Sequence, residues 1–385
     1  MLNLDENDIR TKFQSSGDGF TGFMDDLIRA QVRFSSLPYR IVEANLRTTQ
    51  VDGGVDTRIT SAVNGEPSGF LNSKTAWQYK ATKTASALGA IPKEVKKNYL
   101  ISCIKERHAY RYCICDSFSS SKRIEINKKL KESISKINPT APEPKVVNAS
   151  DVAAWASHFP ALVLRYFFPG TAMGFLHFQA WKNNITALTP QYAPVDSWNV
   201  LSQKISEFLD FSKIPPDPVL LIQGQAGVGK TRMVFESIVA IDGAPVLTIY
   251  TSNEQKAEEI AYHIANDTRL YVILVADECV IKSREKLKSI AQGCKDRLRI
   301  IAIDNDSRRP ATLAPEYWLP NLDEATTEKV LATNFSHIPS EQRRAIVKLS
   351  GGFIGMAAGM CNHYKDFPGN GIGAAVATIE GYYDS

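Results

Sequence analysis

The sequence predicts an α/β fold in which short strands alternate with amphipathic helices along the chain. Apolar runs at 219–222 and 270–276 have the length of buried strands, and a helical spacing of apolar residues follows the first of them at 233–241. The chain has 385 residues, which is enough for two or three domains with their own cores. We expect an α/β domain with a connector, a parallel-sheet domain and a small helical subdomain, at residues 1–185, 186–315 and 316–385.

The segment Gly224-Gln225-Ala226-Gly227-Val228-Gly229-Lys230-Thr231 matches G-x-x-x-x-G-K-[ST] at every fixed position. Glycines allow the backbone N–H groups of such a loop to turn toward a phosphate. Lys230 adds a positive charge for the outer phosphates, and the Thr231 hydroxyl is a ligand for Mg²⁺. A strand before the loop and a helix after it are the setting that this chemistry requires. The segment therefore predicts a site for ATP and Mg²⁺.

A second signature of nucleoside triphosphatases follows in the apolar run that ends in Asp277-Glu278. A buried parallel strand delivers the residues at its carboxyl end to the edge of the sheet where ligands bind. We expect Asp277 to hold Mg²⁺, directly or through water, and Glu278 to activate the hydrolytic water.

The strand expected at 299–305 also ends in polar residues. Either Asp304 or Asn305 is a candidate to sense the outer phosphate. Arg308 and Arg309 follow, and they either neutralise charge in the transition state or serve as structural or solvated loop residues.

Charge is distributed unevenly between the two halves of the chain. Residues 1–190 contain 25 Lys and Arg against 17 Asp and Glu, whereas residues 191–385 contain 20 against 24. The basic half is either the nucleic-acid contact or a solvated basic face. The six cysteines form no C-x-x-C pair and the six histidines show no zinc spacing, so we expect reduced thiols in a cytoplasmic protein. We see no signal peptide, and the most apolar long stretch, at 159–178, contains Arg165 and two prolines, so we expect no membrane contact.

A different chemistry is predicted in the basic half. A helix is expected at 20–34 and strands at 39–46, 55–63 and 75–82. Because strand side chains alternate, Gln78 and Lys80 project to one face and Trp77, Tyr79 and Ala81 to the other. Hydrolysis of a phosphodiester requires Mg²⁺ on oxygen ligands and a cation near the attacking water.

Residues around the third strand provide both requirements. Asp56, the side-chain oxygen of Gln78 and the Tyr79 carbonyl are candidate metal ligands. Lys80 is the candidate cation that positions or polarises the water. The alternative without a catalytic site is an ordinary amphipathic β-hairpin beside a helix.

The run Gly53-Gly54-Val55-Asp56, followed by Trp77-Gln78-Tyr79-Lys80, resembles the Mrr-type branch of the PD-(D/E)xK endonucleases over residues 20–165. The resemblance implies a restriction-endonuclease-like α/β domain with glutamine at a position where other branches carry an acid. It also implies an acidic residue on the first helix. Asp26, which flanks the apolar face of that helix, is our candidate, with Asp25, expected to point away, and Glu43 as alternatives.

Several connecting elements are also predicted. Lysines on the polar side of a helix at 124–137 either contact phosphates or are solvated. Ser150 is expected to cap a helix at 151–159, and Ser252 with Gln255 has the spacing of a capping box. Residues 166–195 are expected to be a connector between domains. A helix at 197–211, a strand at 245–250 and helices at 324–334 and 340–349 complete the prediction.

The segment Leu349-Ser350-Gly351-Gly352-Phe353-Ile354-Gly355-Met356-Ala357-Ala358 resembles the G-G-x-P-x-x-A element of STAND NTPases, with Ile354 in place of the proline. The Thr231-Arg232 pair also matches that family, and the resemblance covers about residues 195–365. It implies that this element lies near the adenine and that Arg232 belongs to the nucleotide site.

An Mrr-like nuclease followed by a STAND NTPase is the domain order of the antiviral proteins called AVAST. That resemblance implies a C-terminal sensor of a phage protein, ATP-bound homo-oligomers such as tetramers, and cleavage of double-stranded DNA. The sequence ends without a repeat array, so we expect either a fragment or sensing by a partner. The alternative is an ATP-binding signalling switch whose nuclease-like domain binds nucleic acid without cutting. A translocating restriction motor ranks last, because we see no helicase motifs.

Overall fold

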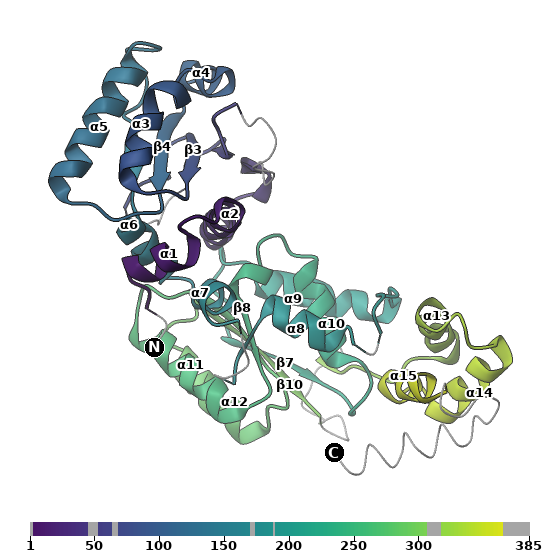
Figure 1. Ribbon diagram of the computed structural model, residues 1–385. Helices are drawn as coiled ribbons and strands as arrows, with labels where there is room; N and C mark the ends of the chain where they lie inside the picture. The colour runs from purple at the N-terminus through teal and green to yellow at the C-terminus, as the bar shows by residue number, and fades with distance from the viewer. Residues whose placement is uncertain are drawn as a thin grey trace. The chain divides into compact units, whose positions relative to one another are not determined.

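The computed structural model describes residues 3–44, 53–63, 68–169, 174–187, 189–305 and 317–364. The chain divides into two compact units. The first unit consists of Met1–Pro169 with the short segments Asp242–Leu247 and Arg269–Val272, and the second contains the rest. Each unit is built around a five-stranded sheet with helices beside it (Figure 1). The predicted α/β fold class is confirmed.

The N-terminal unit contains a mixed sheet with the strand order β1-β2-β3-β4-β5. Strand β2 is antiparallel to both of its neighbours, β1 and β3, and β3, β4 and β5 are parallel. The two central strands are almost fully buried because helices cover both of their faces. The strands are Val42–Ala44, Thr57–Ile59, Thr75–Lys80, Ala109–Ile114 and Lys145–Val147.

The two faces of this sheet carry different cores. Trp77 packs against Trp155, and Tyr79 against Phe20, on the face covered by α2 and α6. Tyr110 and Tyr112 project to the other face, into an apolar cluster with α3, α4 and α5. The helices of this unit are α1 (Glu6–Phe13), α2 (Gly17–Phe34), α3 (Thr84–Glu94), α4 (Asn98–Lys105), α5 (Ser120–Ser135), α6 (Ala149–Ala156) and α7 (Pro160–Phe167).

Three predicted elements of this unit differ in the structure. Residues Tyr39–Ile41 form a 3-10 turn, so only Val42–Ala44 of the expected 39–46 strand is extended in the described part. Strand β2 is limited to Thr57–Ile59, where it pairs with β3. Helix α6 begins at Ala149 rather than after Ser150, because the Asn148 side chain accepts from the Asp151 N–H and forms a capping box with it.

The C-terminal unit contains a second sheet with the order β6-β8-β9-β10-β7. Strands β8 and β9 are parallel, as are β10 and β7, and β6 runs antiparallel to β8. The parallel strands are buried apolar runs, as the sequence predicts. The strands are Leu176–His177 (β6), Val219–Gln223 (β7), Thr248–Thr251 (β8), Val272–Ala276 (β9) and Leu298–Asp304 (β10).

Helices cover both sides of this sheet, with α11 and α12 on one side and α8, α9 and α10 on the other (Figure 1). Three further helices, α13 to α15, form a separate helical layer, and the predicted helices at 324–334 and 340–349 are confirmed. The helices are α8 (Phe178–Ile185), α9 (Asn199–Phe208), α10 (Lys230–Val239), α11 (Glu254–Asn266), α12 (Ile281–Ala291), α13 (Glu324–Asn334), α14 (Ser340–Ser350) and α15 (Ile354–His363).

The expected connector at 166–195 was wrong in part, because it contains β6 and α8. The reason is aromatic packing: Trp181 of α8 stacks on Tyr250, and Phe178 stacks on Phe235. Residues 245–247 form a 3-10 turn before β8, and Asn253 rather than Ser252 caps α11, since its side chain accepts from the Lys256 N–H. In the part of the chain that the structure describes, no helix has both the length and the apolar character that a membrane crossing requires.

The capping residue of α6 provides a test of the local structure. Replacing Asn148 with Ala removes the acceptor for the Asp151 N–H, and we expect the free energy of unfolding to fall by about 1 kcal/mol. Ser150→Ala is the matched control, because Ser150 is exposed and should change stability by less than about 0.5 kcal/mol. Denaturant unfolding of both variants measures the difference, and a larger loss for Ser150→Ala would contradict the capping assignment.

Candidate functional site

The loop between β7 and α10 has the backbone that a phosphate-binding loop requires. Gly227 and Gly229 have φ angles of 80° and 97°, in the left-handed region that favours glycine. A Cβ at Gly229 would also lie 3.0 Å from the Trp198 ring, so this position tolerates no side chain without a shift. Helix α10 begins at Lys230, directly after the loop, and its N-terminal N–H groups face the same space.

Lys230 is folded back onto this loop. Its Nζ donates hydrogen bonds to the carbonyl oxygens of Gly224 and Gln225, both at 2.7 Å, and the side chain is only 4% exposed. Burial lowers the pKa of Lys230 to about 8, although the carboxylates of Asp277 and Asp304 oppose the change. A buried ammonium with only carbonyl acceptors is a fitting partner for an anion in the loop.

The end of β9 brings an acid to the start of α10. The Thr231 hydroxyl donates to Asp277 Oδ2 at 2.8 Å, and the Tyr250 hydroxyl donates to the same oxygen at 3.0 Å. The structure therefore groups Thr231 with Asp277, the two residues expected to hold Mg²⁺. Tyr250 is a contact that the sequence did not indicate, and burial raises the pKa of its hydroxyl.

Glu278 follows Asp277 in an uncommon conformation. Its φ angle is 56°, its N–H donates to Asp277 Oδ1 at 3.0 Å, and its side chain is exposed. Left-handed backbone at a non-glycine residue is strained and occurs preferentially at functional sites.

Strand β10 ends beside the same loop. Asp304 Oδ2 accepts a hydrogen bond from Gln223 Nε2 at 2.9 Å, which links the ends of β10 and β7. Asn305 lines the cavity described below. Arg308 and Arg309, for which a catalytic and a structural role were both considered, lie outside the described residues.

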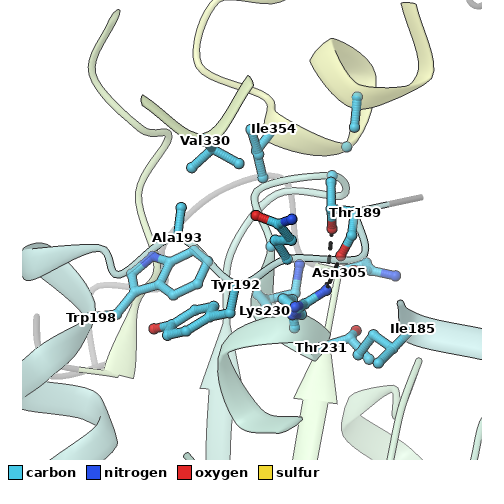
Figure 2. A pocket seen from close by; sticks show the side chains of 16 residues that line it. Ile185, Thr189, Tyr192, Ala193, Trp198, Lys230, Thr231, Asn305, Val330 and Ile354 are labelled. Atoms are coloured by element: carbon cyan, nitrogen blue, oxygen red, sulfur yellow. Dashed lines mark hydrogen bonds between the residues drawn. The ribbon is translucent and has the colours of Figure 1, made fainter. Parts of the chain in front are cut away.

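A cavity of about 300 Å³ opens beside the loop (Figure 2). Val330 and Ile354 lie across it from Lys230 and Tyr192. The indole Nε1 of Trp198 has no hydrogen-bond partner among the described residues, although the side chain is 4% exposed. The lining residues are Ile185, Thr189, Gln191, Tyr192, Ala193, Trp198, Gly227, Gly229, Lys230, Thr231, Arg232, Asn305, Val330, Ile354, Gly355 and Ala358.

Two contacts fix the walls of this cavity. Arg232 donates to the Thr189 carbonyl at 2.6 Å and pairs with Glu236 at 2.7 Å, so it anchors the segment before α9. The Gly355 N–H, in the first turn of α15, donates to the Gly227 carbonyl at 2.8 Å. The segment at 351–358, which was expected to lie near the adenine, therefore contacts the loop at 224–231 directly. It does so with Ile354 at the position where the STAND element has a proline.

The second group of predicted residues meets in the N-terminal unit. Asp56 is 7% exposed, and its Oδ2 accepts from the Tyr79 N–H at 2.6 Å. The antiparallel pairing of β2 with β3 sets Thr57 opposite Trp77, which places Asp56 across from Gln78. Gln78 and Lys80 project toward α3, as the alternation of the strand predicts.

Glu94, the last residue of α3, is a residue of this group that the sequence reading missed. Gln78 Nε2 donates to Glu94 Oε2 at 2.5 Å, and Lys80 Nζ lies 2.7 Å from Oε1. Lys97 pairs with the same carboxylate at 2.8 Å. Burial raises the pKa of Glu94, but the hydrogen bonds from Lys80, Lys97 and Gln78 outweigh it and lower the pKa from 4.5 to about 2.

The sequence offered three candidates for a further acid of this group, and the structure gives Asp26, Asp25 and Glu43 different partners. Asp26 accepts from the Tyr166 hydroxyl and pairs with Arg165, both at 2.7 Å, on the face opposite to Gln78 and Lys80. The structure therefore groups Asp26 with α7 and not with Gln78 and Lys80.

The prediction that Asp25 points away was wrong: it is buried, pairs with Arg29 at 2.6 Å, and has a raised pKa because of burial. Glu43 pairs with Arg58 at 3.3 Å and lines a cavity of about 230 Å³ together with Asp56. Among the described residues, no cluster of three or more His, Cys, Asp or Glu side chains is arranged to hold a metal.

No protein-family model matches the sequence, and no curated protein matches it. Among solved structures, that of PCH-2 from C. elegans is similar over 52% of this chain and 72% of the other, with 14% sequence identity and a TM-score of 0.35.

The ion pairs of Glu94 predict a pH dependence of stability. Because its folded pKa lies below the ordinary value of 4.5, its contribution is present above pH 4.5 and is lost as the pH falls toward 2. The pKa difference corresponds to about 3 kcal/mol, as an order of magnitude. We expect the stability advantage of the wild type over Glu94→Gln, measured by denaturant unfolding, to shrink over this range. An advantage that is constant from pH 6 to pH 2 would contradict the ion-pair account.

Proposed function

We propose that the C-terminal unit binds ATP with Mg²⁺ and hydrolyses it. The observation that carries the proposal is the buried ammonium of Lys230, held by two loop carbonyls at the start of α10 and beside the Thr231–Asp277 pair. This arrangement leaves a positive charge, backbone N–H groups and two oxygen ligands around one small space.

The residues around this space have the donors and oxygen ligands that a nucleotide and Mg²⁺ require. Gly227 and Gly229 keep the loop open to phosphates, and the orphaned Trp198 N–H offers a donor to a base or ribose in the adjoining cavity. Thr231 and Asp277 are the residues that would hold Mg²⁺, which neutralises phosphate charge when bound. Lys230 would exchange its loop carbonyls for phosphate oxygens.

Glu278 is the proposed base for the hydrolytic water. Its side chain is exposed next to Asp277, and its left-handed backbone fixes the direction in which the chain leaves β9. Asp277 would hold the metal and Glu278 would accept the proton of the attacking water, so the two neighbouring acids would have different roles.

A second activity is proposed for the N-terminal unit, namely Mg²⁺-dependent cleavage of double-stranded DNA. It is supported by the meeting of Asp56, Gln78 and Lys80 on one side of the β2–β3 pair. Asp56 would hold the metal, and Lys80 would orient the attacking water. Gln78 was also expected to hold the metal, but its side-chain oxygen accepts from the Tyr110 hydroxyl, so its amide is a positioning group instead. The excess of basic residues in this half favours a polyanionic substrate.

The two activities together suggest a nucleotide-controlled nuclease of antiviral defence. In this proposal the domains are those expected at 1–185, 186–315 and 316–385, ATP drives homo-oligomerisation in the cytoplasm, and a phage protein is the trigger. The alternative is an ATP switch whose N-terminal unit holds nucleic acid without cutting it. The engagement of both Gln78 and Lys80 by Glu94 favours a built reaction site over a plain binding surface.

The nucleotide site is tested by Lys230→Ala. We expect calorimetry in the presence of Mg²⁺ to detect no ATP binding at concentrations that saturate the wild type, because the outer phosphates lose their main side-chain charge. Lys282→Ala, an exposed lysine of α12, is the matched control and should bind as the wild type does. Unchanged affinity in Lys230→Ala would refute the assignment.

The nuclease proposal is tested by Asp56→Ala and Lys80→Ala. Each should eliminate plasmid cleavage with Mg²⁺ and ATP while leaving ATP hydrolysis unchanged, because the two chemistries use different residues. Lys12→Ala, an exposed lysine of α1, should cut at the wild-type rate. If Asp56→Ala degrades plasmid as fast as the wild type, or if the wild type never cuts, the ATP-switch alternative replaces the nuclease.

A further inference from the structure

The side chain of Gln78 forms a relay between a tyrosine and an acid. The Tyr110 hydroxyl donates to Gln78 Oε1 at 2.5 Å, and Gln78 Nε2 donates to Glu94 Oε2 at 2.5 Å. Gln78 is 1% exposed and Glu94 is 8% exposed. The amide is thus fixed at one end by a donor and offers its own donor to the carboxylate at the other.

The loop before β2 approaches the same helix end. Leu100 at the start of α4 donates its N–H to the Gly53 carbonyl at 3.1 Å. A Cβ at Gly54, which has a φ of 90°, would lie 2.9 Å from the Lys97 side chain and 3.4 Å from the Glu94 carbonyl. The backbone that carries Asp56 therefore packs closely on the junction of α3 and α4, where Glu94 lies.

We propose that Glu94 supplies the second carboxylate of a divalent-metal site that it shares with Asp56, while the Gln78 amide holds Glu94 in place. The inference rests on the proposed nuclease function of the N-terminal unit. With Asp56 alone, the site would offer a metal one negative charge, because Gln78 is neutral and Lys80 is positive. Glu94 provides the missing charge from a helix instead of from the strand.

This placement also explains why position 78 carries an amide. A carboxylate at 78 would face the Glu94 carboxylate at hydrogen-bond distance, and like charges that close disfavour each other's ionised forms. An amide instead donates to Glu94 and keeps it ionised. The acid that other branches of the resembling family carry on the strand is thus transferred to the helix in this chain.

Two lysines pair with the Glu94 carboxylate. Lys80 and Lys97 balance the carboxylate charge. A divalent cation would take over part of that role, which frees the Lys80 ammonium to meet a phosphate or a water.

The test measures Mn²⁺ binding to the full chain without nucleotide, by calorimetry. We expect Glu94→Gln to weaken Mn²⁺ binding about tenfold or more, as Asp56→Asn should. Glu125→Gln, an exposed acid of α5, is the matched control and should bind as the wild type does. Asp277→Asn reports how much of the signal belongs to the C-terminal unit.

A charge-swapped double variant makes the test independent of any folding defect. Gln78→Glu combined with Glu94→Gln restores one carboxylate and one amide in exchanged places, and we expect it to recover most of the Mn²⁺ affinity. If Asp56→Asn weakens binding but Glu94→Gln does not, Glu94 is only a counter-ion for the lysines and the proposal is overturned, while the proposed nuclease stands. If the wild type shows no Mn²⁺ binding that depends on Asp56, the metal-dependent nuclease itself fails.

Discussion

The nucleotide site proposed for the C-terminal unit depends on the position of the Lys230 ammonium group. A buried cation needs strong acceptors, and here two loop carbonyls at 2.7 Å supply them. Those carbonyls are available because the glycines turn the loop through left-handed conformations. Strands β10 and β7 lie side by side, which brings Asp304 of β10 to Gln223, the residue directly before the loop.

In the N-terminal unit the buried charged group is negative instead of positive. Its buried carboxylate, Glu94, is surrounded by two ammonium groups and an amide. Helix α3 provides the acid, the turn before α4 provides Lys97, and β3 provides the other lysine and the amide. In both units a charged group that is costly to bury is kept by partners from neighbouring elements, and in both it lies where an ionic ligand is expected.

The parts that the sequence predicted well are those encoded locally. The strand and helix on either side of residues 224–231 and the buried strand before Asp277 follow directly from short apolar runs, and the alternation of β3 placed Gln78 and Lys80 on one face. Glu94 was missed because its partners come from another element, and no local pattern marks the last residue of a helix as a site residue. Asp25 was misjudged because helical periodicity gives the direction of a side chain but not the neighbours that cover it. The connector prediction failed because the aromatic residues of 176–185 pack on Tyr250 and Phe235, which are distant in sequence.

The central claim is that the loop from Gly224 to Thr231 binds the phosphates of ATP through its backbone. Hydrogen–deuterium exchange of the full chain, with and without Mg²⁺ and ATP, measures this directly. The account predicts that exchange of the amides in 224–232 slows at saturating ATP, because those N–H groups acquire phosphate acceptors. Unchanged exchange in this segment, while ATP is shown to be bound, would contradict it.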